Sequence, residues 1–290
     1  MYGYLPAILS DCPNSVILPV DYKKIIEQRI ELQPFMTEIK WLPSIEQCFA
    51  AVTKVVLATT PAKQPDIAMS VLTYPNVKEL YLEKPLAVDP VSSDRLLEKL
   101  NGSQIKFRIN YSFFYCAWFE KFRRCRFREN DEHLSLDWHF KASHFLTHNQ
   151  TWKKNHAAGG GVLRFYGIHL IALLAKLGYT EVSFSSLTGE LLPEPAQWTA
   201  LFHGGGVKDC RVTINSNSNQ SCFSVDQIGV SNVTRIIDLV TPFDLEAPLH
   251  KQDSRVNILR AFLSDANVPD ADLYGWYEAT NKLWSGIETY

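Results

Sequence analysis

The chain has 290 residues, of which 46% are hydrophobic, 12% aromatic and 21% charged, and this composition excludes a disordered, collagen-like, coiled-coil or low-complexity protein. Lys and Arg number 29 against 31 Asp and Glu, so the net charge of -2 provides no overall basic field that would hold a nucleic acid. At about 100 to 200 residues per domain, the length predicts two domains.

A parallel α/β pattern runs through the first 110 residues. Short β-rich runs alternate there with helical stretches, as in sheets whose strands are joined by helices. Asp89 followed by Pro90 is typical of an N-cap with proline at the first helical position, and Leu96, Leu97 and Leu100 share the inward face of the helix that follows. The sequence predicts strands at 16–21, 55–59, 77–82 and 105–109, and an earlier helix at 65–74.

After Asn110 the pattern changes, and we place the domain boundary there. Alternating strands become frequent, which is typical of a large, mainly antiparallel sheet. The fold class is therefore α/β, with a parallel α/β domain at 1–110 and an α+β domain at 111–290. Helices are expected at 112–124, from Gly161 to Lys176, at 254–264 and at 273–289, and strands at 133–140, 181–187, 198–202, 209–214, 222–228 and 234–240.

The sequence indicates a cytoplasmic protein without a membrane span. The longest uncharged apolar run, 165–175, is shorter than the ~20 residues that cross a bilayer. The N-terminus lacks the charged and apolar regions of a secretion signal. The densest basic run, 121–128, is followed at once by acids, which favours a solvated junction. The cysteines at 12, 48, 116, 125, 210 and 222 form no C-x-x-C motif, which favours free thiols over a disulfide framework or a metal site.

Gly3 and Asp21 have the spacing of the end of a dinucleotide-binding fingerprint. Gly3 opens an apolar helix, and Asp21 follows at the end of a predicted strand. The Asp21 carboxylate would accept hydrogen bonds from an adenosine ribose, while amides of the first helical turn would face the pyrophosphate. An ordinary turn glycine and a strand-end aspartate explain the same spacing.

Glu83-Lys84-Pro85 and Gly159-Gly-Gly161 are two further candidate motifs. Lys84 follows a predicted parallel strand at its carboxyl end, where open α/β sheets bind ligands, and Pro85 restrains the backbone. The three glycines allow close backbone approach, and the next helix carries Phe165 and His169 four residues apart. A surface lysine and a hydrogen-bonded core histidine are the alternative interpretations.

Together these motifs resemble the Gfo/Idh/MocA family of nicotinamide-dependent oxidoreductases, over nearly the full chain. The resemblance implies a Rossmann domain, then an α+β domain whose open sheet often forms the interface of a homo-oligomer. It also implies that a hydride is transferred between NAD and a sugar or cyclitol carbon. NADP is the alternative cofactor. The matching segments are 3–8, Val20-Asp21, 55–61, 81–87, Ile109-Asn110, 159–161 with Gly167-x-His169, and the last helix with Trp284.

Site residues implied by the resemblance are found at the matching positions. Lys84 would be the active-site lysine, preceding a proline whose peptide bond is often cis in the family. His169 would transfer the proton of the substrate hydroxyl while Lys84 stabilises developing charge. Asp21 would hold the adenosine ribose, and the dinucleotide would run past Gly3, Thr59, Pro61 and Glu83.

Two departures from the family pattern leave other functions open. Phe165 stands where many relatives have aspartate, and Ala172 where an acid is common, so Arg164 and Tyr166 are candidates for replacement polarity. Met1 falls just after the expected second glycine, so the first strand and two phosphate-loop glycines are expected to be missing. The alternatives are a catalytically impaired member that serves as a binding or assembly protein, and a reductase of a nonsugar substrate such as a tetrapyrrole.

Overall fold

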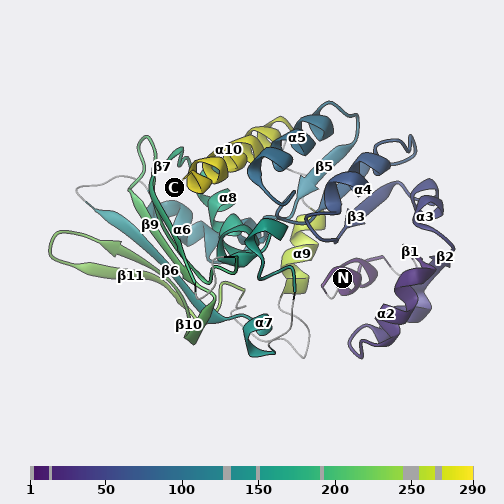
Figure 1. The fold of residues 1–290 in the computed structure, drawn as a ribbon, viewed down its shortest axis with the longest axis horizontal. Helices are drawn as coiled ribbons and strands as arrows, with labels where there is room; N and C mark the ends of the chain where they lie inside the picture. The colour runs from purple at the N-terminus through teal and green to yellow at the C-terminus, as the bar shows by residue number, and fades with distance from the viewer. Residues whose placement is uncertain are drawn as a thin grey trace.

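The first part of the chain forms five short parallel strands in two separate sheets (Figure 1). The computed structural model describes residues 3–12, 15–126, 132–147, 151–189, 193–243, 255–264 and 270–289. The strand β1 (Val16–Pro19) pairs with β2 (Ile39–Leu42), and β3 (Lys54–Leu57) pairs with β4 (Glu79–Leu82), which pairs with β5 (Lys106–Ile109). The predicted parallel half is confirmed.

Helices of this half lie between the strands in sequence. As predicted, Asp89 caps α5, because its Oδ1 accepts a hydrogen bond of 2.8 Å from the Ser92 amide. The sequence pattern did not reveal β2 or α3, since four- and seven-residue elements show little periodicity. The helices are α1 (Tyr4–Leu9), α2 (Lys23–Glu27), α3 (Ile45–Ala51), α4 (Gln64–Val71) and α5 (Pro90–Asn101).

A six-stranded sheet dominates the second part, with strand order β11-β10-β6-β9-β8-β7. Among its described strands, β6 and β9 form the one parallel pair, so the mainly antiparallel sheet is confirmed. The strands are β6 (His133–Lys141), β7 (Glu181–Thr188), β8 (Gln197–His203), β9 (Cys210–Asn215), β10 (Asn217–Ile228) and β11 (Val233–Leu239).

The helices of the second part include two that return to the first part. The helix predicted at 112–124 is interrupted, with a 3-10 turn at Ser112–Tyr115 before α6 (Phe119–Cys125). Figure 1 shows α10 beside α5 and α9 beside α1. The remaining helices are α7 (Ser143–Leu146), α8 (Ile168–Lys176), α9 (Arg255–Ser264) and α10 (Asp270–Glu288), and a π-helical segment, Val162–Gly167, leads into α8.

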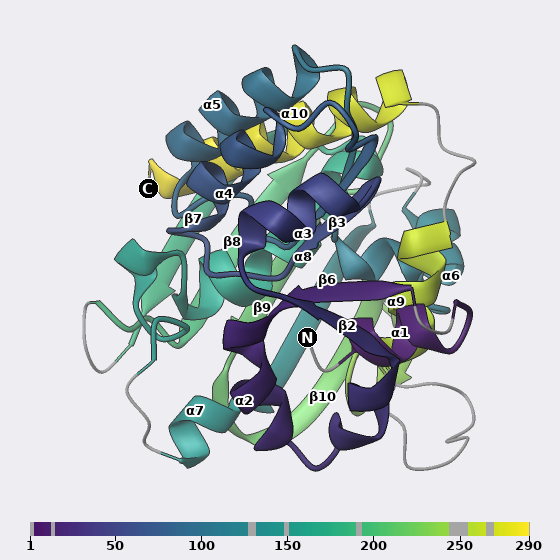
Figure 2. The same cartoon turned by 90° about the vertical axis from the view of Figure 1, so that its right-hand side faces the viewer.

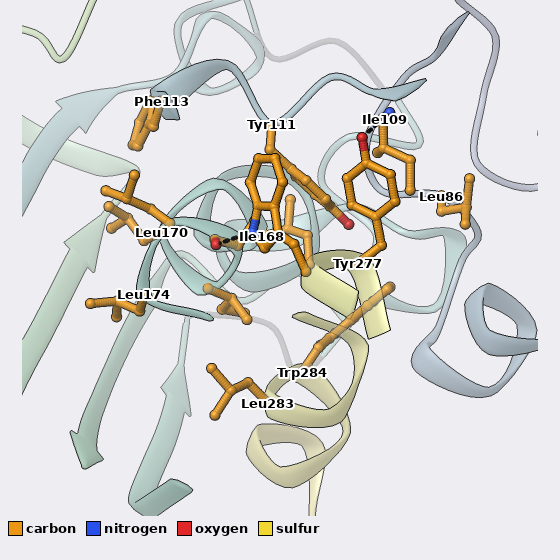
Figure 3. Packing of buried hydrophobic residues seen from close by; sticks show 14 of the residues in the cluster. Leu86, Ile109, Tyr111, Phe113, Ile168, Leu170, Leu174, Tyr277, Leu283 and Trp284 are labelled. Atoms are coloured by element: carbon orange, nitrogen blue, oxygen red, sulfur yellow. Dashed lines mark hydrogen bonds between the residues drawn. The ribbon is translucent and has the colours of Figure 1, made fainter. Parts of the chain in front are cut away.

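Aromatic side chains of α10 join the core of the large sheet to the parallel strands. Figure 3 shows the Tyr277 hydroxyl bonded to the Ile109 amide at the end of β5, 3.1 Å away. Trp276 donates from its indole nitrogen to the Ala172 carbonyl of α8, at 2.6 Å. By length and composition the segment His156–Lys176 would cross a membrane, but most of it is buried inside the protein, as in the core helices of many proteins.

A partly buried ion pair fixes the end of α10 to the π-helical segment before α8. Arg164 donates to both carboxylate oxygens of Glu288, at 2.7 and 3.0 Å, and His156 lies 3.1 Å from the same carboxylate. Arg164 also donates to the carbonyls of Val88 and His156. Arg164 is thus neither a surface residue nor available to a substrate, because its donors are used inside the fold.

Glu288→Gln should destabilise the protein by about 2 kcal/mol, because Arg164, whose side chain is only 12% exposed, would keep its charge without its anion. Burial would raise the pKa of Glu288, but hydrogen bonds from His156 and Arg164 outweigh it and lower this pKa to about 2. The contribution is therefore present above pH 4.5, the ordinary carboxyl pKa, and is lost as the pH falls towards 2. Urea unfolding at pH 7 measures the difference, with exposed Glu278→Gln on the same helix as control. An equal loss of unfolding free energy in Glu288→Gln and Glu278→Gln would contradict this prediction.

Candidate functional site

The Glu83-Lys84-Pro85 turn follows β4 and is held by the buried side chain of Gln64. The Gln64 amide nitrogen donates to the carbonyls of Glu83 and Leu86, at 2.7 and 3.0 Å, and its oxygen accepts from the Glu83 amide at 3.2 Å. The Lys84-Pro85 peptide bond is cis. Because Gln64 satisfies the backbone of this turn on both sides, it positions Lys84, and sequence reasoning missed it. No local signal marked it, because Gln64 is one of several polar residues in α4, together with Asp66 and Ser70.

The Glu83 carboxylate is used inside the protein. Its Oε1 accepts from the Tyr4 hydroxyl at 2.7 Å and from the Asn110 side-chain amide at 3.0 Å. Asn110 Oδ1 in turn accepts from the Ser112 hydroxyl at 2.9 Å. This network joins α1 to the ends of β4 and β5. Glu83 thus orients the site residues around it, and its expected contact with a dinucleotide stays a prediction.

Lys84 reaches from this turn to the π-helical segment before α8. Its ammonium donates to the Phe165 carbonyl at 2.5 Å and lies 4.0 Å from the centroid of the Phe165 ring. Burial and the charges of Lys153 and Arg255 lower the pKa of Lys84 to about 7, against the opposing effect of Glu83. Lys84 is therefore suited to exchange a proton near neutral pH.

His169 lies on α8, buried among aromatic rings and 4% exposed. It stacks on Phe113, with ring centroids 4.9 Å apart. It also lies edge-to-face with Phe243, with ring centroids 6.4 Å apart. Its Nδ1 has no hydrogen-bond partner within the described residues. Burial and the charge of Lys84 hold the pKa of His169 well below its usual range, so the imidazole is neutral at pH 7.

The three glycines connect the loop before α8 to the parallel half. A side chain at Gly159, whose φ is +81°, would come within 2.8 Å of Pro61 and 3.2 Å of the Val88 backbone. A side chain at Gly160 would meet the Trp152 carbonyl at 2.2 Å. The glycines thus allow the loop at 151–158 to lie close to its neighbours, and Pro61 lies next to Gly159.

A cavity of about 810 Å³ separates β1 from β3. Within the described chain, β1 pairs with β2 alone and β3 with β4 alone, so each presents an unpaired edge to the cavity. Figure 2 shows the β1–β2 pair apart from the remaining parallel strands. The lining is largely apolar and includes Leu18, Val55 and Leu57, with Thr59 at the carboxyl end of β3. Within the described residues these two strands therefore face each other across the cavity without pairing.

The other two residues predicted to contact a dinucleotide are Asp21 and Gly3. Asp21 is exposed in the 3-10 turn that follows β1. Gly3 precedes α1, and a side chain on it would come within 2.5 Å of Leu259 in α9. Gly3 therefore allows close packing of two helices in this structure, and its contact with a pyrophosphate stays a prediction.

Several solved structures share this fold at low sequence identity. The dehydrogenase WlbA from Bordetella pertussis, in complex with NADH and UDP-GlcNAcA, has a TM-score of 0.71 at 11% identity over 99% of this chain and 92% of its own. Levoglucosan dehydrogenase, in complex with NADH and levoglucosan, has a TM-score of 0.67 at 11% identity over the same shares. A super-repressor mutant of Gal80p from Saccharomyces cerevisiae has a TM-score of 0.68 at 11% identity, again over 99% and 92%.

No protein-family model matches the chain, and neither does any curated protein sequence. At these identities the structural likeness establishes the fold alone, a parallel Rossmann-like part followed by a large, mainly antiparallel sheet.

Proposed function

We propose that the chain is an oxidoreductase that transfers a hydride between NAD(H) and a hydroxyl-bearing carbon of a sugar or sugar derivative. The observation that carries this proposal is Lys84, which is fixed at the carboxyl end of β4 with a pKa lowered to about 7. Open α/β sheets bind their ligands at this edge. Support also comes from the similar structures of WlbA and levoglucosan dehydrogenase, both of which hold NADH.

The chemistry of the donor groups fits the two ends of a dinucleotide. Asp21 offers an exposed carboxylate after β1 for the adenosine ribose, and Thr59 offers a hydroxyl after β3. Lys84 would lie at the nicotinamide end, where a bound cofactor accepts or supplies the hydride. The dinucleotide would also pass Gly3, Pro61 and Glu83. These residues would shape its path by packing and by orienting their neighbours, because none of them has a free polar side-chain group.

Lys84 and His169 divide the proton chemistry in this proposal. In oxidation, neutral Lys84 would take the hydroxyl proton as the hydride leaves the carbon, and in reduction its ammonium would return a proton to the new oxygen. His169, neutral and buried beside Lys84, would hydrogen-bond the same oxygen through a ring nitrogen. This assigns the main proton exchange to Lys84, whereas the family resemblance alone favoured His169.

Titration of the full chain with NADH, followed by cofactor fluorescence, tests the proposal. We expect binding, with NADH preferred over NADPH, because the Asp21 carboxylate would bind a ribose diol and repel a 2'-phosphate. Asp21→Asn should reduce the ratio of the NADPH dissociation constant to the NADH dissociation constant by ~10-fold. Lys23 and Lys24 follow Asp21, so tighter binding of NADPH by the unchanged protein would mean that they control selection instead.

A binding or assembly protein is the second candidate. Phe165 in place of the family's aspartate favours it, because its ring covers the Lys84 ammonium at 4.0 Å. The likeness to Gal80p, whose structure is that of a repressor, is compatible with this function. Binding of NADH without hydride transfer between the cofactor and glucose, glucuronate or glucose 6-phosphate would support this candidate.

Four further features belong to the proposal. The boundary between a dinucleotide-binding domain at 1–110 and a substrate-binding domain at 111–290 remains a prediction, as do a cytoplasmic location and a homo-oligomer formed through the large sheet. We infer that the cavity between β1 and β3 is the position of one further parallel strand, since both bordering edges are unpaired within the described chain. Such a strand would carry the phosphate-binding turn at its carboxyl end.

A further inference from the structure

Positive side chains gather beside Lys84 on the loop seated by the glycines. The Lys153 ammonium lies 5.3 Å from the Phe165 ring, the same ring that Lys84 approaches to 4.0 Å. The next residue, Lys154, is 9% exposed, and its ammonium lies 5.3 Å from the Phe145 ring. Three lysine ammonium groups therefore lie on or near one run of aromatic rings.

The rings form a continuous wall between these cations. The ring centroid of Phe165 lies 4.7 Å from that of Tyr166 and 5.4 Å from that of Trp152. The ring centroid of His144 lies 6.4 Å from that of Tyr166 and 4.6 Å from that of Phe145. Such rings match the apolar faces of a sugar ring. A ligand lying along the wall would meet Lys84 at one end and Lys154 at the other.

The positive charge of this region is not balanced within the described residues. The segments 143–147 and 151–161 contain no acid, and no salt bridge joins Lys153 or Lys154 to a described carboxylate. Two acids of other segments lie in this region, but Glu83 is held by Tyr4 and Asn110, and Glu288 by Arg164 and His156. Lys154 is only 9% exposed and its ammonium has no carboxylate partner among the described residues, so an anion that reached it would meet an uncompensated charge.

His144 and Lys153 respond to this unbalanced charge. Burial and the charges of Lys154 and Lys153 lower the pKa of His144 to about 4, and its Nδ1 has no partner among the described groups. Partial burial and the charge of Arg255 lower the pKa of Lys153. The field over the wall is thus positive, and a neutral His144 has a ring nitrogen left to bind a ligand.

The loop that carries both lysines is fixed in place. The Gly161 amide donates to the Lys153 carbonyl at 2.8 Å, and the Gly160 amide donates to the Asn155 carbonyl at 2.9 Å. Because a side chain on Gly160 would collide with the Trp152 and Lys153 backbone, the glycines allow this close approach. The backbone from which both lysine side chains extend is therefore held in place before a ligand arrives.

We propose that Lys153 and Lys154 bind the anionic group of the substrate, so that the enzyme acts on a sugar derivative carrying a carboxylate or a phosphate rather than on a neutral sugar. The proposal rests on the proposed function for the identity of the sugar. Its geometric basis is separate, because it stands on two lysines and a set of aromatic rings, none of which is a residue assigned to the dinucleotide. Lys84 remains the group next to the reacting hydroxyl.

Isothermal titration at low salt, with glucose, glucuronate and glucose 6-phosphate as probes, tests this inference. We expect at least one anionic probe to bind ~10-fold more tightly than glucose, and ~10-fold more weakly after Lys154→Gln or Lys153→Gln, because a charged hydrogen-bond donor is lost. The two anionic probes distinguish a carboxylate site from a phosphate site. Lys99→Gln, which removes an exposed lysine from α5, serves as the control of equal charge.

Two outcomes would overturn the inference. One is equal or absent binding of all three probes, and the other is an anion preference that survives in the Lys153→Gln/Lys154→Gln double variant. Separate titration with NADH distinguishes this failure from failure of the proposed function. Binding of an anionic probe without binding of NADH would support the anion site and contradict the oxidoreductase function. Binding of NADH without a preference for anionic probes would support the oxidoreductase function and contradict the anion site.

Discussion

Lys84→Ala should lower kcat/KM by about 100-fold or more at pH 7, once a substrate is found. Lys84 is the one site group whose pKa, about 7, matches proton exchange at that pH, and its ammonium is positioned by the Phe165 carbonyl. The alanine variant lacks both the proton carrier and the positive charge near the developing oxyanion. His169→Ala should also lower turnover by ~100-fold, through loss of the second hydrogen-bonding group.

The pH profile separates a proton carrier from a fixed charge. In oxidation Lys84 must be neutral to accept a proton, so the rate should rise as the pH passes through about 7. In reduction it must be charged, so the rate should fall over the same range. Lys84→Arg keeps the charge but does not deprotonate, so its oxidation profile should lose this step.

Circular dichroism and thermal unfolding of each variant confirm that the fold is kept, and exposed Lys99→Ala provides a control for loss of a lysine. Unchanged turnover in both Lys84→Ala and His169→Ala would leave these residues with structural roles alone. A flat profile in the unchanged enzyme would remove Lys84 as the proton carrier while leaving its charge in place.

Filling the cavity between β1 and β3 should strengthen NADH binding by about 100-fold. The change is an N-terminal extension, a designed run of five or six β-branched residues (roughly one mean strand length) ending in Gly-x-Gly. Its backbone would pair with both unpaired edges, and the turn would present amides to the pyrophosphate. Two such charge-assisted bonds at about 1.5 kcal/mol each correspond to about 100-fold in Kd.

The matched control carries the same Gly-x-Gly turn after a strand in which alternate residues are proline, since proline has no amide to donate to the sheet. We expect the designed strand to raise both the thermal midpoint and the NADH affinity, and the control to raise neither. Equal affinity in the original chain and both extended chains would show that the cavity has no part in cofactor binding.

Local patterns were enough to predict much of the fold. The parallel half, the alternating strands of the large sheet and the Asp89 N-cap were each confirmed, because period-two alternation and capping chemistry act between residues close in sequence. The end of the first strand was less exact. Residues 20–22 form a 3-10 turn, so β1 ends at Pro19 rather than at Asp21.

The tertiary structure alone decided the chemical state of the site and its surroundings. Sequence gave no sign that Gln64 clamps the Lys84 turn, or that Arg164 is committed to Glu288, 124 residues away. The lowered pKa of Lys84 depends on burial and on Lys153 and Arg255, which belong to other segments. Burial, charge and edge pairing depend on which distant segments meet, and a local pattern carries no record of those contacts.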